Sequence, residues 1–293
     1  DKIKIEHYEP AFLKGIEEQN AEIKAIVESR ETPGFENTIV ALDNSGRTLA
    51  RVKGVFYALT EADTNDEMSA LSEKIAPVLS EHNDNIYLNQ DLYKRVAAVW
   101  QQEQEGKITL TTEQHRLLDR YHKAFIRSGA GLDTGKQNRL REINKELSTL
   151  AITFSNHVLN ENNAYRLVID NEAELAGLPE WVKTGAAEEA KAVGKEGKWL
   201  FTLQNSSRLP LLQYADNREL RKDIYEAYIN RGNNGDANDN KEILKKIISL
   251  RLEKANLLGF DCYSNFVLDE GTKEITITIK AENGETKEYK VTI

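Results

Sequence analysis

Apolar residues recur every three or four positions through most of this 293-residue chain, and that spacing constrains the fold more than any other feature. In the clearest stretch, about 134–162, they fall along one face of a helix: Leu140, Ile143, Leu147, Leu150, Phe154 and Val158. The five prolines all lie at or before Pro210, so long stretches are free to be helical. The pattern predicts a mainly α fold, a body of many helices.

A second strong helix is predicted over about 241–258. Asp239 or Asn240 is available as its N-cap, and Gly259 stands where a left-handed residue ends a helix. Weaker periodicity predicts further helices over about 10–29, 37–62, 66–82, 90–105, 111–127, 179–193 and 217–230.

Two short segments break the helical pattern. Residues 165–169 and 198–203 are rich in β-branched and aromatic side chains and are bounded by turn residues, which is typical of strands. They are far enough apart in the chain to hold a helix between them. We therefore expect a small two-stranded excursion inside the helical body.

The last 23 residues, 271–293, alternate apolar and polar side chains on either side of Asn283-Gly284, which is a hairpin signal. A three-residue loop, 282–284, with Gly284 left-handed would pair Ile277 with Tyr289 and Ile275 with Val291. This register puts the apolar residues on one face. The sequence therefore divides into a helical part, 1–270, and a β-hairpin tail, 271–293, of different origin.

A lone hairpin is only marginally stable in water. The tail is therefore expected to dock on the body, on a missing sheet or on another chain. The last case would be self-association through 271–293.

Composition excludes several classes of function. The formal net charge of −9, from 39 basic and 48 acidic residues, argues against a nucleic-acid partner, because phosphate binding needs a concentrated basic face. No apolar run approaches the roughly 20 residues of a membrane span. The single cysteine, Cys262, excludes an internal disulfide framework and a cysteine-rich zinc module.

No metal site is predicted. The sequence contains no H-E-x-x-H, and the nearest substitute is His115, Asp119 and His122 on one face of a predicted helix. Seven residues of helix separate the two histidines by about 10 Å, which is too far for one zinc ion. A solvated polar face with an Asp–His contact is the better interpretation.

Two loops resemble ligand-binding motifs only in part. The loop 236–240 begins like a calcium loop, but its sixth and twelfth positions are Lys241 and Ile247 in place of Gly and Glu, so a capped helix start accounts for it better. The segment 129–136 has the wrong spacing for a phosphate loop, and Gln137 replaces the magnesium-binding hydroxyl. We expect it to be a loop between helices.

No catalytic or cofactor-binding residue is predicted either. Cys262 lies beside Tyr263 and Phe266 without an evident histidine partner, which favours a packing role. The three tryptophans could line a peptide cleft, but a tryptophan on an apolar helix face is more often part of the core: Trp100, Trp181 and Trp199.

Several separated motifs, in the same order over about residues 1–270, are nevertheless specific. They are His7–Phe12, Phe35–Gly46, Thr64–Glu67, Asp84–Asn89, Lys198–Leu203, Tyr214–Arg221, Asp236–Asp239 and Leu257–Phe260. Together they resemble the N-terminal half of bacterial peptidyl-dipeptidases in the thimet-oligopeptidase family of zinc metallopeptidases.

The resemblance implies an almost wholly helical fold that forms one wall of a deep peptide channel. Full-length relatives remove C-terminal dipeptides from short peptides, with zinc held by H-E-x-x-H and a later Glu. Those positions lie downstream of the matched region, so the resemblance assigns no catalytic, cofactor or metal residue to this chain. It implies a bacterial protein and leaves cytoplasm and periplasm both open.

Two hypotheses follow for function. In the first, the chain is the non-catalytic N-terminal portion of a zinc peptidyl-dipeptidase, is inactive alone and holds no zinc. In the second, it is a stand-alone helical scaffold or a peptide- or protein-binding module.

Overall fold

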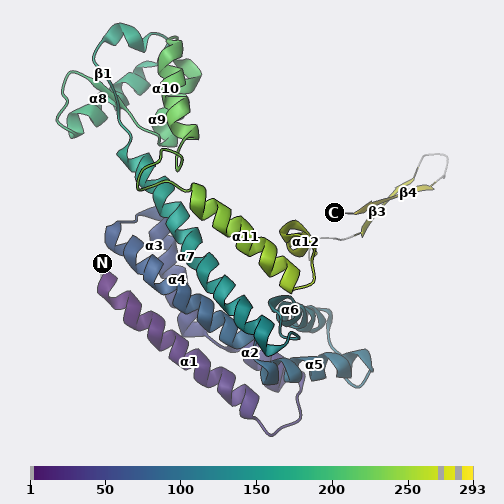
Figure 1. Cartoon of the computed structure of the whole chain (residues 1–293). Coiled ribbons are helices and arrows are strands. Elements are labelled where there is room, and N and C mark those ends of the chain that lie inside the picture. The colour runs from purple at the N-terminus through teal and green to yellow at the C-terminus, as the bar shows by residue number, and fades with distance from the viewer. Residues whose placement is uncertain (1–2, 270–273, 281–285, 293) are drawn as a thin grey trace. The chain divides into compact units, whose positions relative to one another are not determined.

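A computed structural model describes residues 3–269 and two strands at 274–280 and 286–292. As predicted, the fold is mainly α (Figure 1). The α-helices are α1 (Tyr8–Glu28), α2 (Ala41–Asn44), α3 (Arg47–Ala62), α4 (Asp66–Tyr87), α5 (Gln90–Gln104), α6 (Thr112–Ser128), α7 (Thr134–Ala164), α8 (Glu180–Ala192), α9 (Asn205–Tyr214), α10 (Arg218–Ile229), α11 (Lys241–Leu257) and α12 (Tyr263–Leu268). Single turns of other helix types cover Ile5–His7, Phe35–Val40 and Glu172–Leu175.

Short polar side chains fix where many of these helices begin. The side chains of Asn65, Asn89 and Asn217 each accept a hydrogen bond from a backbone N–H in the first turn of α4, α5 and α10. Thr111 and Gln114 form a reciprocal capping box at the start of α6. Each such cap satisfies N–H groups that a helix leaves unpaired at its start.

The prediction of a single helix over 37–62 is wrong. The chain forms a π-helical turn at Phe35–Val40 and then the short α2, and it restarts as α3 after Gly46. Gly46 has φ of +71°, and a Cβ there would lie 2.4 Å from the side-chain Cδ of Gln19. The turn therefore favours glycine for its backbone conformation, and a Cβ there would also displace the Gln19 side chain.

Contacts divide the chain into two compact units, residues 1–149 with 247–293 and residues 150–246. The first unit has two apolar clusters. One gathers around Phe56 of α3, with Tyr8 and Phe12 packed edge-on against its ring. The other surrounds Phe125 of α6 and includes Leu92 of α5.

The second unit contains the predicted two-stranded excursion. β1 (Leu167–Ile169) and β2 (Trp199–Phe201) pair antiparallel, with Val168 opposite Leu200. Helix α8 lies between them in sequence, and its buried stripe of Val182, Ala186 and Ala190 faces the core of this unit. The strands of this excursion thus form within the ranges that the sequence predicts.

The tail contains β3 (Glu274–Lys280) and β4 (Thr286–Thr292), which pair antiparallel. Ile277 stands opposite Tyr289 and Ile275 opposite Val291, the register that apolar alternation favours. The predicted loop at 282–284 and the predicted cover of the apolar face lie outside the described residues.

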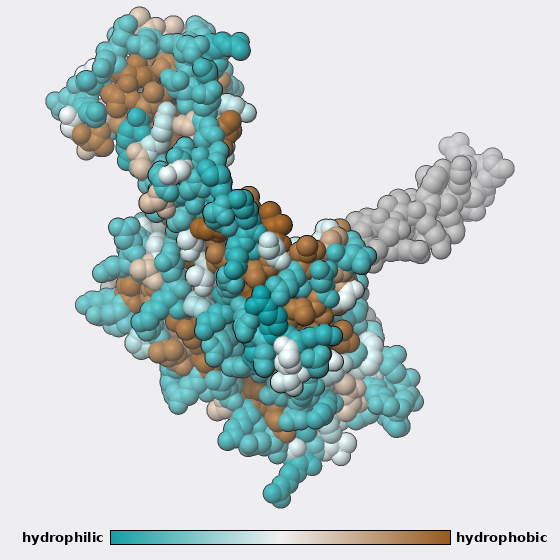
Figure 2. Space-filling view, viewed as in Figure 1, coloured by the Kyte–Doolittle hydropathy of each residue, from teal (hydrophilic) through white to brown (hydrophobic). Residues whose placement is uncertain are grey.

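Hydrophilic residues predominate on the visible face of each unit, and apolar side chains form smaller patches between them (Figure 2). Within the described ranges, no helix is both long and apolar enough to cross a membrane.

Candidate functional site

The histidines considered for a metal site lie on α6 and face the indole of Trp100 on α5. The rings of His122 and Trp100 stack with centroids 4.5 Å apart, and the ring of His115 lies 6.3 Å from the same indole. Burial lowers the pKa of His122, although the charge of Asp119 partly opposes this shift. The two histidines thus pack around an aromatic ring.

The Asp–His contact expected on this face is replaced by other pairs. Asp119 forms an ion pair with Lys123 one turn along the helix, at 2.8 Å, and His115 Nδ1 lies 2.8 Å from Glu103 Oε1 on α5. Across the part of the chain that the structure describes, no group of three or more His, Cys, Asp or Glu side chains is arranged to hold a metal ion.

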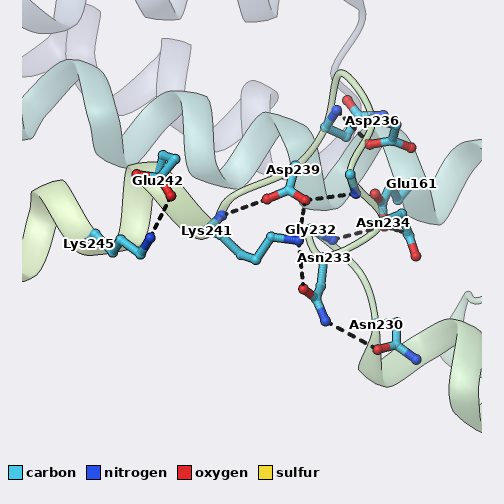
Figure 3. Close-up of polar contacts among 12 residues, drawn as sticks. Glu161, Asn230, Gly232, Asn233, Asn234, Asp236, Asp239, Lys241, Glu242 and Lys245 are labelled. Carbon is cyan, nitrogen blue, oxygen red and sulfur yellow. Dashed lines mark hydrogen bonds and ion pairs between the residues drawn. The ribbon is translucent and has the colours of Figure 1, made fainter.

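The loop that begins like a calcium loop connects α10 to α11 in the second unit (Figure 3). Asp236 Oδ1 accepts a hydrogen bond from the backbone N–H of Asn238 at 2.9 Å. Asp239 accepts from the backbone N–H groups of Gly235 and Lys241 at 2.8 and 2.9 Å. The bond from Lys241 satisfies the first backbone N–H of α11, in keeping with the capped helix start that the sequence predicts, and the other two bonds lie within the loop.

A lysine supplies the positive charge in this loop. Lys241 Nζ lies 2.7 Å from Asp239 Oδ2 and donates to Asn233 Oδ1 at 3.1 Å (Figure 3). The hydrogen bonds from Lys241 lower the pKa of Asp239 to about 2. The ammonium therefore takes part of the role that a bound cation has in a true calcium loop.

The other support of the loop is Glu161, a buried residue of α7. Its Oε2 accepts hydrogen bonds from the backbone N–H of Gly232 at 2.9 Å and from Asn234 Nδ2 at 3.0 Å (Figure 3). On the same helix, His157 Nδ1 lies 2.9 Å from Asn240 Oδ1. Since Glu161 is about 70 positions from its partners, no local pattern in the sequence could have identified it.

The predicted loop between helices is present over residues 129–133 of the glycine-rich segment 129–136, whose last three residues already belong to α7. Gly129 ends α6 with φ of +93°, and Asp133 Oδ1 accepts from the backbone N–H of Lys136 at the start of α7. Gln137 is buried, and its amide donates to the carbonyl oxygens of Gly129 and Ala130 at 3.2 Å. Gln137, which stands where a phosphate loop has a hydroxyl residue, thus stabilises the conformation of this loop.

Cys262 stands at the N-cap of α12 and is half-buried. Its Sγ lies 3.0 Å from Ser264 Oγ, and this hydrogen bond lowers the pKa of the thiol. No described histidine is hydrogen-bonded to it, so its surroundings are those of a helix start.

The tryptophans behave differently from one another. Trp100 and Trp199 are half-buried beside the apolar clusters of their units, in keeping with a core role. Trp181 is 62% exposed, so the core role expected for it is wrong. It lies in the first turn of α8 and lines a pocket of about 420 Å³ in the second unit.

Buried polar contacts in the first unit were also not predicted from the sequence. Arg95 of α5 donates to the carbonyl oxygens of Ser29 and Glu31 and so fixes the segment after α1. Asp84 Oδ1 accepts from Asn144 Nδ2 at 2.8 Å, and Lys254 Nζ donates to Asn144 Oδ1 at 2.7 Å. Burial raises the pKa of Asp84 and lowers that of Lys254, so both charges are held at a cost.

A family model, peptidase family M3, matches residues 211–286. Dipeptidyl carboxypeptidases of Escherichia coli K12 and Salmonella typhimurium LT2 are 38% and 39% identical to this chain over 264 residues. The chain is similar to peptidases of family M3.

The resemblance drawn from the separated motifs is thereby confirmed. Oligopeptidase A of Salmonella typhimurium is also similar, at 33% identity over 267 residues. These alignments cover 90% of this chain and 38% or 39% of each relative, so the chain spans less than two-fifths of their length. The family model extends beyond Glu270 into the tail segment.

Proposed function

We propose that this chain is the non-catalytic, channel-wall portion of a zinc metallopeptidase that removes C-terminal dipeptides from short peptides. The observation that carries the proposal is the alignment over 90% of the chain with two dipeptidyl carboxypeptidases, at 38% and 39% identity. Oligopeptidase A aligns over 90% to 91% of the chain at 32% to 33% identity. The higher identity favours release of dipeptides over more general oligopeptide cleavage.

The residues that the structure describes do not fit a catalytic zinc ion. Zinc in such enzymes needs three converging ligands and an open position for water. His115 and His122 pack around Trp100, and Asp119 is paired with Lys123. The 293-residue sequence also lacks H-E-x-x-H. We therefore assign the zinc and its chemistry to residues outside this sequence, and expect these 293 residues to be inactive by themselves.

The surface of the first unit offers a place for a further part of such a peptidase to pack. Ile248 and Leu252, one turn apart on α11, are 58% and 45% exposed, and Val267 on α12 is 50% exposed. Apolar side chains gather over α11 and α12 in Figure 2. Large apolar side chains grouped in this way are typical of surfaces that are covered in a larger assembly.

A chimera tests the proposal. Residues 1–270 would replace the matching segment of the E. coli dipeptidyl carboxypeptidase, and zinc content and dipeptide release would be measured. The proposal predicts that the chimera releases C-terminal dipeptides and that this release depends on zinc. The double variant Ile248→Lys/Leu252→Lys should lose this activity. Glu242→Lys, an exposed change on the same helix, should keep it. A folded, zinc-loaded chimera that releases no dipeptide would contradict it.

The second candidate is a stand-alone helical scaffold or peptide-binding module, which the exposed Trp181 beside a pocket favours. The coding sequence that follows Glu270 in the source genome separates the two candidates. An H-E-x-x-H in the same reading frame supports the peptidase portion, and its absence supports the binding module.

We also propose that the tail mediates self-association through its apolar face. Replacing Ile277 and Tyr289 by lysine should then convert a dimer into a monomer, as measured by chain mass in solution. If the double variant is a monomer like the parent but melts at a lower temperature, the tail docks on its own chain. If neither property changes, the proposal is wrong.

A further inference from the structure

The second unit contains a pocket that neither the family resemblance nor the proposed function assigns. Its volume is about 420 Å³, near the lower end of the range of roughly 300–1,000 Å³ for small-ligand sites. One wall is α8, and the others are the end of α7, strand β2 and the start of α9. All of its lining residues belong to residues 150–246, so the pocket is complete within one unit.

Helix α8 presents two adjacent stripes with different roles. Val182, Ala186 and Ala190 are buried, and the first two border the pocket from the core side. Trp181, Gly185 and Glu189, spaced four residues apart, form the exposed stripe along the pocket. Since a Cβ on Gly185 would meet no atom within 4 Å, the glycine leaves open space between the indole and the carboxylate.

The pocket carries one group of each charge. Arg166 follows the end of α7, and its Nη1 donates to the carbonyl oxygens of Asn163 and Tyr165 at 2.5 and 2.8 Å. These bonds hold the guanidinium at the helix end. Among the described residues, Arg166 forms no ion pair with Glu189, and Glu189 has no other ion-pair partner. Both charges are therefore available to a ligand.

We propose that this pocket binds a short zwitterionic peptide the size of a dipeptide, with its carboxylate at Arg166, its ammonium at Glu189 and an apolar side chain against Trp181. A guanidinium recognises a carboxylate through its planar fork of donors, and an aromatic face attracts apolar groups at low entropic cost. Ser206 and Gln204 at the rim supply further polar contacts. A phosphorylated ligand fits less well because Glu189 would repel it.

This inference goes beyond the proposed function and rests on it only for the choice of dipeptides over other zwitterions. Binding at the pocket requires no cleavage, so it can be measured on the 293-residue chain. It can therefore fail while the peptidase proposal stands, and it can hold if the chain is a binding module.

The experiment is calorimetric titration of the purified chain with the dipeptide phenylalanyl-leucine, with tryptophan fluorescence as a second readout. Acetyl-phenylalanyl-leucine amide, which lacks both charges, and free phenylalanine serve as comparison ligands. We expect the free dipeptide to bind, and both comparison ligands to bind at least 10-fold more weakly. The blocked dipeptide loses both charge-assisted contacts, each of which corresponds to about that factor, and free phenylalanine, whose two charges are on one carbon, is expected to reach only one of the two charged groups.

Substitutions locate the binding. Gly185→Leu should abolish it by filling the pocket, and Gly185→Ala, which adds one carbon at the same position, should largely keep it. Arg166→Gln and Glu189→Gln should each weaken binding about 10-fold. Glu188→Gln, an exposed change on the same helix outside the pocket lining, should have no effect.

Three results would overturn the proposal. The first is no heat and no fluorescence change at millimolar dipeptide. The second is unchanged binding in Gly185→Leu or Arg166→Gln chains with normal helix content by circular dichroism. The third is equal binding of the charge-blocked dipeptide or of phenylalanine alone.

Discussion

Replacing Glu161 by alanine should destabilise the second unit, because this carboxylate holds the loop between α10 and α11. Its Oε2 accepts from the buried N–H of Gly232 and from the amide of Asn234. Hydrogen bonds to a charged group contribute about 1.5–3 kcal/mol each, and leaving the N–H of Gly232 unpaired costs about 1–3 kcal/mol. The substitution also removes the cost of burying a carboxylate whose Oε1 has no hydrogen-bond partner among the described residues.

The balance of these terms is a loss of about 2 kcal/mol in the free energy of unfolding for Glu161→Ala. Glu161→Gln keeps a carbonyl acceptor for Gly232 and should stay within about 1 kcal/mol of the parent. Urea unfolding followed by the fluorescence of Trp181 and Trp199, both in this unit, measures the change. Hydrogen exchange at the Gly232 amide reports directly on the broken bond.

The matched control is Glu188→Ala, an exposed change in the same unit that should have little effect. If Glu161→Ala is as stable as Glu188→Ala and the Gly232 amide keeps its protection, the role assigned to Glu161 is refuted. A rise in melting temperature on adding millimolar calcium would separately refute the role assigned to Lys241.

Five further substitutions test the local physics. Gly46→Ala should lower the free energy of unfolding by about 1–2 kcal/mol, because φ is +71° and a Cβ would displace the Gln19 side chain. Gly54→Ala, in α3 at a position where a Cβ meets no other atom within 4 Å, should raise it by about 0.5–1 kcal/mol. Chemical denaturation measures both changes. The pKa of Asp239 is depressed from 3.8 to about 2, so its stabilising contribution is complete above pH 3.8 and is lost as the pH falls through 2. As the pH is lowered between those values, the melting temperature of Asp239→Asn should therefore fall less steeply than that of the parent chain. Phe201→Ala, at a fully buried position, should cost about 3–5 kcal/mol, and Trp181→Ala at its exposed position less than about 1 kcal/mol.

Local sequence signals account for most of the helices and for the paired strands β1 and β2. They fail where a turn conformation determines the end of a helix. The left-handed turn at Gly46, for example, divides the helix predicted over 37–62. They also miss α9, whose ten residues include Pro210 and carry little apolar periodicity, and the six-residue α12. Short helices of this kind are stabilised by their tertiary neighbours more than by their own pattern.

The groups that hold loops in place could not be predicted for a different reason. Arg95 and Glu161 look like ordinary exposed charges on amphipathic helices, and only the fold brings their partners from more than 60 positions away. The same holds for the exposure of Trp181, which depends on what covers the first turn of α8. The absence of catalytic and metal residues stays a prediction.

Zinc content and peptidase activity of the purified 293-residue chain test whether these residues are a non-catalytic portion of a peptidase. After dialysis against metal-free buffer, the chain would be analysed for zinc and incubated with short peptides, and released dipeptides would be quantified. We expect no stoichiometric zinc and no dipeptide release, since the sequence contains no H-E-x-x-H and the histidines of α6 pack around Trp100. One tightly held zinc per chain, with dipeptide release that is lost on chelation, would contradict it.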